Sequence, residues 1–356
     1  YGLNVSDALV RNAAQVLIDK GLAAKGWNSI NIDDGWEAPA RSANGEIVGN
    51  ARFPDMTALG NFLHDRGLRF GIYSSPGATT CGGYLGSLGH ERQDAASYAR
   101  WGVDYLKYDL CSYAANMSKP PTLEEHQRPY HLMGEALHKQ ARSMVFSLCQ
   151  YGEQQVWTWG ASVGGSVWRM TADIFDNWNS VQETGFAQAP YTRFVAPGRW
   201  NDPDMLVVGQ LGWGDALRPS RLAPDEQYSH ISLWSLLAAP LLLGNDLPSL
   251  DEFTLSLLTN HEVIDINQDA RGMAAQRMLN QDDWQVWVKE LEGGAKAVGV
   301  FNMGSRFRST QIESSLFGRA DPFQLRDAWR HKDLGVQSKN ITVNVPAHGV
   351  MLLLVK

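Results

Sequence analysis

Long apolar runs are missing from this chain of 356 residues. The longest run, from Leu236 to Gly244, falls well short of the roughly 20 residues that a membrane-spanning helix needs. A strong excess of positive charge is also missing, because the net charge is −7 and the isoelectric point is near 5.7. We therefore expect neither a nucleic acid nor a membrane as a partner.

Cysteine is scarce, and its spacing excludes the common metal-binding patterns. The three cysteines, Cys81, Cys111 and Cys149, show no CxxC or Cys/His ligand spacing. One disulfide and one remaining thiol is an arrangement found in exported proteins, although their spacing does not fix the pairing. The sequence shows no signal peptide and begins at Tyr1 without a methionine. This beginning fits a cytoplasmic protein or a processed chain, and it favours processing or truncation.

Aromatic residues, in contrast, are abundant. The chain contains 13 tryptophans and 11 tyrosines, and 44% of its residues are hydrophobic. Such a composition is typical of a globular protein. The aromatic side chains also suit a site that stacks against the flat apolar faces of sugars. The length is sufficient for one large domain and one small domain.

Short apolar segments alternate with helical segments as far as about Gly272, at the spacing of a parallel α/β fold. In nearly all of the predicted strands, polar residues follow the apolar run. The seven predicted strands are Ser29–Ile32, Leu68–Tyr73, Val103–Tyr108, Met144–Cys149, Ser166–Ile174, the proline-containing Arg199–Met205, and Pro240–Gly244.

A closed (β/α)8 TIM barrel is the fold that this alternation favours, with its site at the carboxyl ends of the strands. A barrel needs eight strands, and the chain begins with a loop and a helix, so we expect the first strand to lie before Tyr1. A doubly wound open sheet is the alternative. It is disfavoured because no glycine-rich phosphate loop follows an early strand.

The pattern changes near Gly272. Beyond this residue the segments alternate apolar and polar positions and are separated by turns, for example at 283–291 and 341–345. We therefore predict two domains, a catalytic barrel over residues 1–272 and an antiparallel β-sandwich over residues 273–356.

The segment from Tyr105 to Cys111 carries chemistry at the end of a buried strand. Asp109 stands at the strand tip, and Lys107 lies two residues earlier on the same side of the strand. The ammonium of Lys107 can hold the carboxylate ionised, which is how a nucleophile is built. The alternative interpretation is a structural Asp–Lys ion pair that closes the strand.

Carboxylates dominate the predicted strand tips, and no histidine stands at any of them. This composition argues against a Ser/His or Cys/His hydrolase, and a two-metal hydrolase would normally recruit histidines as well. Two carboxylates that flank a glycosidic bond fit best. The polar residues at the tips are Asp33, Asp34, Tyr73, Lys107, Asp109, Cys149, Arg169, Asp173, Asp202 and Asp204.

Four motifs resemble those of glycoside hydrolase family 27, which contains α-galactosidases and α-N-acetylgalactosaminidases. They are Asn31–Trp36 (NIDDGW), Tyr105–Cys111 (YLKYDLC), Trp168–Ile174 (WRMTADI) and Arg199–Leu206 (RWNDPDML). The resemblance runs from the N-terminus to about Asp269 and is closest to bacterial α-galactosidases. It implies a TIM barrel followed by a C-terminal β-domain.

The resemblance also implies roles for individual residues. Asp109 would be the nucleophile that forms the glycosyl-enzyme, and Asp173 would be the acid/base. Asp33 and Asp34 would bind the 4- and 6-hydroxyls of galactose. The remaining implied substrate contacts are Lys107 at the C3 or C4 hydroxyl, Arg169 near C2, and Tyr73 and Met205 against the apolar face of the ring.

Other residues of the motifs are interpreted structurally or left open. For Asp202 and Asp204 we favour hydrogen bonds within a turn around Pro203. Trp36 fits either the core or a ring contact. Asp173 would stay protonated because its setting is less polar and because the charge of Asp109 repels a second negative charge.

Cys81 and Cys111 match two family positions that are bridged to each other, so the resemblance implies this disulfide. Cys149 and Tyr151 lie in the loop that reads the C2 substituent in relatives. A bulky cysteine and an aromatic residue there suit a hydroxyl and exclude an acetamido group, although many relatives have tryptophan at the position of Tyr151.

We therefore expect a retaining exo-α-galactosidase, without a metal or organic cofactor, acting on galactose-containing oligosaccharides or glycoconjugates outside the cytoplasm, secreted or periplasmic. The same family offers β-L-arabinopyranosidase, which a larger residue at the Asp33/Asp34 pair would favour, and α-N-acetylgalactosaminidase. A non-catalytic sugar-binding protein is the alternative from another class. The long stretch Leu211–Pro224 could reshape the outer subsites or form a homo-oligomer contact.

Overall fold

The computed structural model describes residues 1–212, 216–319 and 322–356. The chain divides into two compact units. The first unit contains Tyr1–Met170, Gly212–Leu217 and Asp246–Ser249. The second unit contains Thr171–Leu211, Arg218–Asn245 and Leu250–Lys356.

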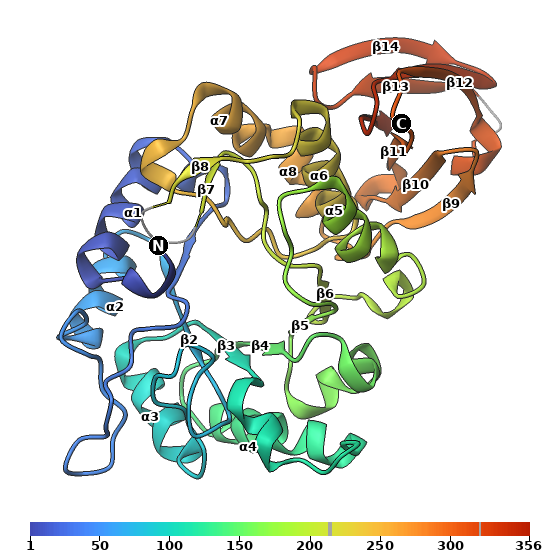
Figure 1. Cartoon of the computed structure of the whole chain (residues 1–356). Coiled ribbons are helices and arrows are strands. Elements are labelled where there is room, and N and C mark those ends of the chain that lie inside the picture. The colour runs from blue at the N-terminus through green and yellow to red at the C-terminus, as the bar shows by residue number, and fades with distance from the viewer. Residues whose placement is uncertain (213–215, 320–321) are drawn as a thin grey trace. The chain divides into compact units, whose positions relative to one another are not determined.

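The first unit is a parallel β-sheet with helices between its strands. The strands pair in chain order from β1 to β5, and β2, β3 and β4 are seen side by side in Figure 1. The strands are β1 (Ser29–Asn31), β2 (Arg69–Ser74), β3 (Tyr105–Asp109), β4 (Val145–Cys149) and β5 (Val167–Arg169), and the helices are α1 (Asp7–Asp19), α2 (Met56–His64), α3 (Glu91–Trp101) and α4 (Leu123–His138), with 3-10 turns η1 (Gly2–Asn4), η2 (Ala23–Lys25), η3 (Cys111–Asn116), η4 (Glu153–Thr158), η5 (Gly160–Val163) and η8 (Leu247–Ser249).

Local sequence signals explain where these helices begin and end. Ser6 caps α1 by accepting the Leu9 N–H. Thr122 and Glu125 form a capping box at the start of α4. Helix α3 ends at Trp101 and is followed by Gly102, whose φ of +80° is a left-handed conformation that glycine adopts without strain.

The register of the parallel strands gathers polar side chains at one edge of this sheet. Tyr73 on β2 is the register partner of Lys107 on β3, and Asp109 at the end of β3 is the partner of Cys149 at the end of β4. Strand β2 is buried from Phe70 to Ser74. The apolar parts of the strands therefore form a core, and their carboxyl ends carry the candidate site.

The second unit contains the remaining elements. It holds the short strand β6 (Trp200–Asp202), a small β7–β8 hairpin and an antiparallel β-domain that follows the helices. Its helices are α5 (Trp178–Thr184), α6 (Pro224–Leu236), α7 (Glu252–Thr259) and α8 (His261–Asn267), its 3-10 turns are η6 (Phe186–Gln188), η7 (Thr192–Phe194), η9 (Glu292–Gly294) and η10 (Ser314–Phe317), and its other strands are β7 (Gln210–Leu211), β8 (Arg218–Pro219), β9 (Gln276–Gln281), β10 (Trp284–Glu290), β11 (Lys296–Asn302), β12 (Arg308–Glu313), β13 (Phe323–Asp327), β14 (Lys332–Gln337), β15 (Asn340–Val345) and β16 (Val350–Val355).

Three predicted strands are wrong in extent, and one of them is Arg199–Met205, of which only Trp200–Asp202 is a strand. Pro240–Gly244 forms only a single parallel bridge, between Leu206 and Leu243, in which the Leu206 N–H donates to the Leu242 carbonyl and the Gly244 N–H donates to the Leu206 carbonyl. The predicted strand Ser166–Ile174 ends at Arg169, and the N–H of Ile174 is bonded to the Asp204 carboxylate instead of to a neighbouring strand.

The long stretch Leu211–Pro224 is only partly described. Strands β7 and β8 pair as an antiparallel hairpin at Gln210–Leu211 and Arg218–Pro219. Residues 213–215 lie outside the described residues. The expectations of an oligomer contact here, and of a barrel strand before Tyr1, stay predictions.

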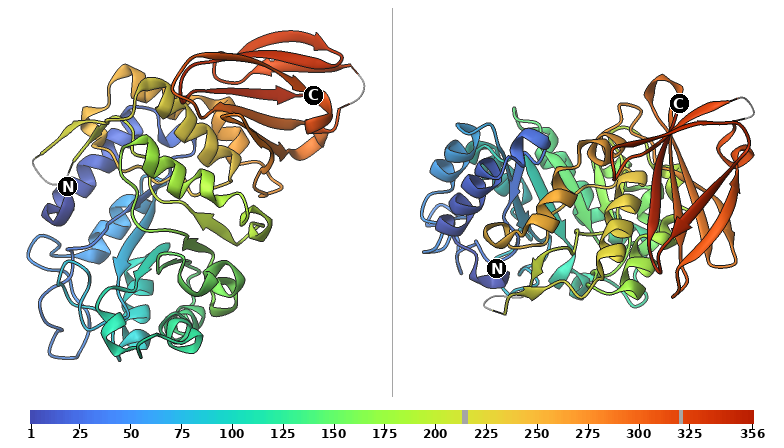
Figure 2. Two further views of the ribbon diagram at one scale, coloured as in Figure 1. Left: turned by 45° about the vertical axis from the view of Figure 1, so that its right-hand side comes forward. Right: turned by 90° about the horizontal axis from the view of Figure 1, so that it is seen from above.

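The C-terminal strands form two sheets around an apolar core. One sheet has the order β14-β13-β16-β11-β10-β9, and β12 pairs with β15 in the other. Strand β15 alternates exposed and buried residues and packs against β11 and β16. The strands coloured orange to red in Figure 2 are those of the two sheets. The core between them includes Val286, Val300 and Leu353.

Buried Lys289 on β10 joins this β-domain to helices of the same unit. Its ammonium donates to the carbonyl oxygens of Ser235 at 3.2 Å and Ile266 at 2.6 Å, near the carboxyl ends of α6 and α8. Helix carboxyl ends carry unpaired carbonyls and a partial negative charge, so an ammonium is favourable there. Burial nevertheless lowers the pKa of Lys289 to about 8.

No helix among the described residues combines the length and the apolar character needed to cross a lipid bilayer.

A buried histidine predicts how acid affects stability. The Val207 N–H donates to Nε2 of His230 at 3.0 Å, and burial lowers the pKa of His230 to about 3. The native imidazole is therefore neutral, while the unfolded chain binds a proton below pH about 6.5. Stability is then lost as the pH falls through this window. The side-chain oxygen of a glutamine can still accept the Val207 N–H, but a glutamine does not bind a proton. Between pH 7 and 4.5 we therefore expect the free energy of unfolding of His230→Gln to fall by about 2 to 3 kcal/mol less than that of wild type.

Urea unfolding at the two pH values measures this difference. His131→Gln is the matched control, because the His131 side chain is exposed beside Glu135. Equal losses in wild type and His230→Gln would contradict the assignment.

Candidate active site

Asp109 is the buried centre of the polar edge of the parallel sheet. Asp109 is the last residue of β3, and it is 6% exposed. The Tyr73 hydroxyl donates to Oδ2 at 3.1 Å, and the Tyr151 hydroxyl donates to Oδ1 at 2.8 Å. Each carboxylate oxygen therefore accepts a hydrogen bond from a phenol, which fixes the orientation of the group.

Burial and charge act in opposite directions on Asp109. Burial raises the pKa of Asp109, the charge of Lys107 and the hydrogen bond from Tyr151 lower it, and the net pKa lies above the ordinary value. The sequence prediction that Lys107 favours the ionised form is thus correct in direction, although burial outweighs the ammonium.

Lys107 forms its ion pair with Asp33. The ammonium lies 2.8 Å from Oδ2 of Asp33, whose side chain is 58% exposed, and 5.1 Å from the centre of the Tyr73 ring. Partial removal from water disfavours the charged form of both side chains. The attraction of the pair is stronger, so the pKa of Asp33 is lowered and that of Lys107 is raised well above its usual value. Both groups are therefore charged at neutral pH.

Asp34 is held by the loop that contains the disulfide. Its Oδ2 accepts the Gly82 N–H at 2.6 Å, and a Cβ at Gly82 would lie only 2.9 Å from the same oxygen. Position 82 must therefore be glycine for this close approach. Burial raises the pKa of Asp34, and hydrogen bonds from Thr80 and Gly82 counteract part of this increase.

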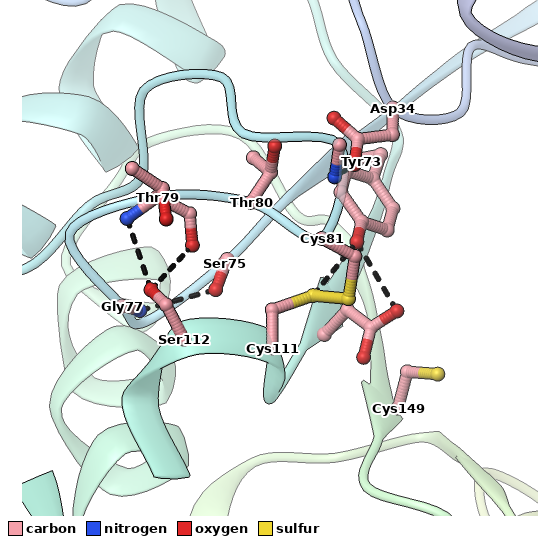
Figure 3. Close-up of a disulfide and its surroundings, with 12 residues drawn as sticks. Asp34, Tyr73, Ser75, Gly77, Thr79, Thr80, Cys81, Cys111, Ser112 and Cys149 are labelled. Carbon is pink, nitrogen blue, oxygen red and sulfur yellow. Dashed lines mark hydrogen bonds between the residues drawn. A yellow bond between two sulfur atoms is a disulfide. The ribbon is translucent and has the colours of Figure 1, made fainter. Parts of the chain in front are cut away.

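Cys81 and Cys111 are joined in a disulfide, as the family resemblance implies. The bridge connects the Gly82 loop to the residues that follow Asp109. The Tyr73 hydroxyl lies 3.1 Å from the sulfur of Cys111, and Figure 3 shows Tyr73 between Asp34 and the bridge. Ser112 closes the same loop by donating to the Thr79 carbonyl and accepting the Thr79 N–H.

Cys149 and Arg169 lie beside each other at the ends of β4 and β5. Both residues are buried, and an Arg169 guanidinium nitrogen lies 3.9 Å from the Cys149 sulfur. Cys149 is a thiol outside the disulfide. This places a cation and a thiol next to the strand end that carries Asp109.

Tyr151 reaches Asp109 from a strained loop. Tyr151, Gln154 and Gln155 have φ values of +63°, +49° and +56°. Such left-handed conformations are costly for residues other than glycine and cluster at functional sites. The loop geometry is thus what brings the Tyr151 hydroxyl to the carboxylate.

Trp36 belongs to the core. Its side chain is fully buried, its indole N–H donates to the Tyr73 carbonyl at 2.8 Å, and it packs edge-on against Tyr98 and Trp101. Of the two interpretations of this residue, the structural one is confirmed.

The remaining predicted site residues lie in the second unit. Asp173 is exposed on the segment that leads to α5, and Met205 is half-buried. The predicted meeting of Asp173 and Asp109 across one sugar stays a prediction, as does the contact of Met205 with the ring.

Asp202 and Asp204 form the turn that the sequence predicts around Pro203. Asp202 accepts the Asp204 N–H at 2.8 Å, and Asp204 accepts the N–H groups of Ile174 and Met205 at the same distance. Asp204 has a φ of +81°. This turn holds the Ile174 backbone, next to Asp173, in place.

Glu37 is a buried carboxyl that sequence reasoning missed. Its residue is fully buried, and neither carboxyl oxygen has a hydrogen-bond partner among the described residues. Burial, followed by the charges of Asp34 and Asp33, raises the pKa of Glu37 well above its usual value. The only sequence signal is its position three residues after Asp34.

Two groups of side chains within the described ranges have the composition of metal ligands. Cys81, Asp109 and Cys111 form one, but the two sulfurs are joined in the disulfide and offer no thiolate. His261, Glu262 and His331 form the other. There the imidazole rings are stacked in parallel, and Arg326 already holds both oxygens of Glu262.

Comparisons with known proteins identify the family. The family model described as "Alpha galactosidase A" matches residues 3–269, and the model of the "Alpha galactosidase C-terminal beta sandwich domain" matches residues 281–355. A probable alpha-galactosidase of Dictyostelium discoideum is 39% identical over 99% of this chain and 89% of its own length. Alpha-galactosidase A of the bacterium Cellvibrio japonicus is 36% identical over 99% of this chain and 88% of its own length.

A solved structure supports the same identification. The crystal structure of alpha-galactosidase I from Mortierella vinacea matches with a TM-score of 0.93 and 32% identity, over 100% of this chain and 94% of that one. The predicted fold class, a (β/α)8 barrel with a C-terminal antiparallel β-sandwich, is thereby confirmed. The chain belongs to the alpha-galactosidase A family of glycoside hydrolase family 27.

Proposed function

We propose that this protein is a retaining exo-α-galactosidase that releases terminal α-D-galactosyl residues through a covalent glycosyl-aspartate intermediate. The observation that carries the proposal is the state of Asp109, a buried strand-end carboxylate with a tyrosine hydroxyl on each oxygen. The Lys107–Asp33 ion pair beside it adds polar groups of both signs that can bind sugar hydroxyls. Family membership supports the same reaction.

Asp109 would act as the nucleophile. One of its oxygens forms a bond to C1 of the galactosyl unit while the bond from C1 to the glycosidic oxygen breaks. Asp173 would give its proton to the departing oxygen and then take a proton from the water that hydrolyses the intermediate. The two phenols hold the attacking carboxylate in one orientation before the sugar arrives.

Asp33, Asp34 and Lys107 would bind the hydroxyls on the far side of the ring. Asp33 offers an exposed carboxylate that the Lys107 ammonium keeps charged, and a charged acceptor makes strong hydrogen bonds to hydroxyls. Asp34 is oriented by the Gly82 N–H. Tyr73 and Met205 would line the apolar face of the sugar, and in our proposal Tyr73 also orients Asp109.

Around C2, the proposal favours a hydroxyl over an acetamido group. Arg169 and Cys149 lie side by side and are buried. With Tyr151 they would form the wall near C2 and bind the hydroxyl. The intact Asp33/Asp34 pair supports galactose over L-arabinopyranose, which lacks C6.

Other predictions from the sequence are retained as proposals. The barrel would extend over residues 1–272 and the β-sandwich domain over residues 273–356. A disulfide such as Cys81–Cys111 forms in oxidising compartments, which supports a secreted or periplasmic location. Galactose-containing oligosaccharides or glycoconjugates would be the substrates.

A panel of nitrophenyl glycosides tests the activity and its specificity. We expect turnover of the α-D-galactoside and little turnover of the β-L-arabinopyranoside or the α-N-acetylgalactosaminide. A preference for the arabinopyranoside would contradict the substrate choice. Absence of turnover on every member would favour a sugar-binding protein.

Removing the nucleophile tests the role of Asp109. Asp109→Ala should abolish turnover, because no covalent intermediate can form. Azide should restore part of the activity by entering the space of the carboxylate, and the product should then be β-galactosyl azide. Wild-type activity without azide would refute the assignment.

The same carboxylate should lower stability while it supports catalysis. The pKa of Asp109 is raised in the folded protein, so the buried charge destabilises the native state above the ordinary carboxyl pKa. We expect Asp109→Asn to be inactive but to melt at a higher temperature than wild type at pH 7. The difference should shrink as the pH falls below about 4, where the wild-type carboxyl is protonated in both states. A variant that melts lower than wild type at pH 7 would contradict this.

Tyr151 should tune the protonation of Asp109. Its hydrogen bond favours the charged carboxylate, and a hydrogen bond to a charged group contributes about 1.5 to 3 kcal/mol. In Tyr151→Phe the acidic limb of the pH profile of kcat/KM should therefore move up by about one pH unit. Tyr113→Phe, a nearby tyrosine on η3, is the matched control. An unmoved acidic limb in Tyr151→Phe would exclude this effect.

A further inference from the structure

An ion cluster lies three residues after the candidate acid/base Asp173, within the second unit. The Asp176 carboxylate is buried, with a side chain only 5% exposed, and it accepts hydrogen bonds from two arginines. Arg218 donates from both Nη atoms, at 2.5 and 3.0 Å. Arg221 donates from its backbone N–H at 2.8 Å and from its guanidinium at 2.9 and 3.2 Å. Each oxygen of Asp176 is therefore held by guanidinium groups.

We propose that Asp176 is a positioning residue for the acid/base of the reaction. Clamped by Arg218 and Arg221, it would hold the acid/base segment, residues 173–176, so that the Asp173 carboxyl stays directed at the glycosidic oxygen. The proposal rests on the function proposed above, because Asp173 must give its proton to the leaving group. Asp176 and the two arginines act through Asp173 and not by touching the sugar.

The acid/base segment depends on side-chain anchors. It forms neither a helix nor a strand, and its residues are alternately exposed and buried, with Ile174 and Asp176 buried and Asp173 exposed. The Ile174 N–H donates to the Asp204 carboxylate at 2.8 Å. Because no helical turn or strand ladder orients this backbone, the anchors at Ile174 and Asp176 set the direction of the exposed Asp173 side chain between them.

The two arginines are themselves fixed to the rest of the unit. Between them, the Ser220 N–H donates to the Gly209 carbonyl at 2.7 Å, and the Ser220 hydroxyl donates to the Val207 carbonyl at 2.8 Å. Strand β8 also pairs with β7. The chain that leads into β7 contains Asp204, which holds Ile174. Both anchors of the acid/base segment therefore come from one hydrogen-bonded substructure.

The charges of the cluster fit a permanent clamp. Burial alone would raise the pKa of Asp176, but the hydrogen bonds from Arg218 and Arg221 outweigh it and lower the pKa well below its usual value. Asp176 is therefore charged wherever the enzyme would work. The side chains of the two arginines are 42% and 61% exposed. Water can solvate them when the carboxylate is removed, so a substitution of Asp176 leaves no buried cation without compensation.

The leaving group of the substrate distinguishes lost positioning from a general loss of structure. A sugar leaves as a strong base and needs the proton of Asp173, whereas fluoride is a weak base and leaves without it. Melibiose, in which galactose is attached to glucose, and α-D-galactosyl fluoride supply the two leaving groups. The ratio of kcat/KM on melibiose to kcat/KM on the fluoride therefore measures proton donation. A variant that is only partly unfolded keeps the wild-type ratio.

We expect Asp176→Ala to lower this ratio by about tenfold to a hundredfold, because a small displacement of a catalytic group has an effect of this size. The double variant Arg218→Ala/Arg221→Ala removes the same clamp from the other side and should lower the ratio similarly. Asp176→Asn keeps an oxygen that can accept the Arg221 N–H, so its ratio should lie between those of wild type and Asp176→Ala. A wild-type ratio in Asp176→Ala would overturn the positioning role.

Asp327→Ala is the matched control. Asp327 on β13 is also a buried carboxylate, and it accepts the backbone N–H of Arg330 at 3.1 Å and its guanidinium at 2.7 Å. It lies in the β-domain, so its loss should leave the ratio at the wild-type value. A ratio lowered equally in Asp327→Ala and Asp176→Ala would overturn the specific role of Asp176. Thermal unfolding of each variant verifies that the fold is retained.

Asp173→Asn separates this inference from the proposed function. If Asp173 is the acid/base, this variant lowers the ratio at least as much as Asp176→Ala does. Equal losses on both substrates in Asp173→Asn would refute the acid/base assignment and the positioning role with it. A lowered ratio in Asp173→Asn together with a wild-type ratio in Asp176→Ala would refute the positioning role alone.

Discussion

The hydrogen bonds from two phenols to one buried carboxylate are the constraint on which the rest of the site depends. Asp109 needs both Tyr73 and Tyr151, and these come from a neighbouring strand and from a distant loop. The register of β2, β3 and β4 supplies the first partner. The strained loop after Cys149 supplies the second. Strand register and loop conformation together fix the orientation of the Asp109 carboxylate. The disulfide between Cys81 and Cys111 holds the residues that follow it.

Charge in this site is arranged to keep the candidate nucleophile reactive. A direct ion pair between Lys107 and Asp109 would stabilise the carboxylate strongly and lower its basicity. The ammonium is instead bonded to Asp33, and it acts on Asp109 through space. Burial raises the pKa of Asp109 while neutral phenols provide orientation. The result is a carboxylate that is held in place without being neutralised by a contact.

How much of this the sequence could predict depends on the range of the interactions. Helix caps such as Ser6 and Thr122 rest on contacts within a few residues, so the local sequence is sufficient to indicate them. The strand ends that carry Asp109 and Cys149 follow from apolar runs and the residues after them. The Cys81–Cys111 pairing came only from the family resemblance. The predicted strand Pro240–Gly244 failed in extent because pairing depends on a partner segment, here only Leu206, that a local apolar run does not specify.

Contacts between distant side chains were beyond a reading of the sequence, and Glu37 shows why this matters for the chemistry. A third carboxyl three residues after Asp34 would be counted as another negative charge. The structure buries it completely and raises its pKa well above the usual value, so the protonated form is favoured. Lys107 then interacts most strongly with the charge of Asp33 and, after it, with Cys149 and Asp109. Because burial decides which carboxyls are charged, a count of acidic residues in the motif overstates the negative charge that a sugar would meet.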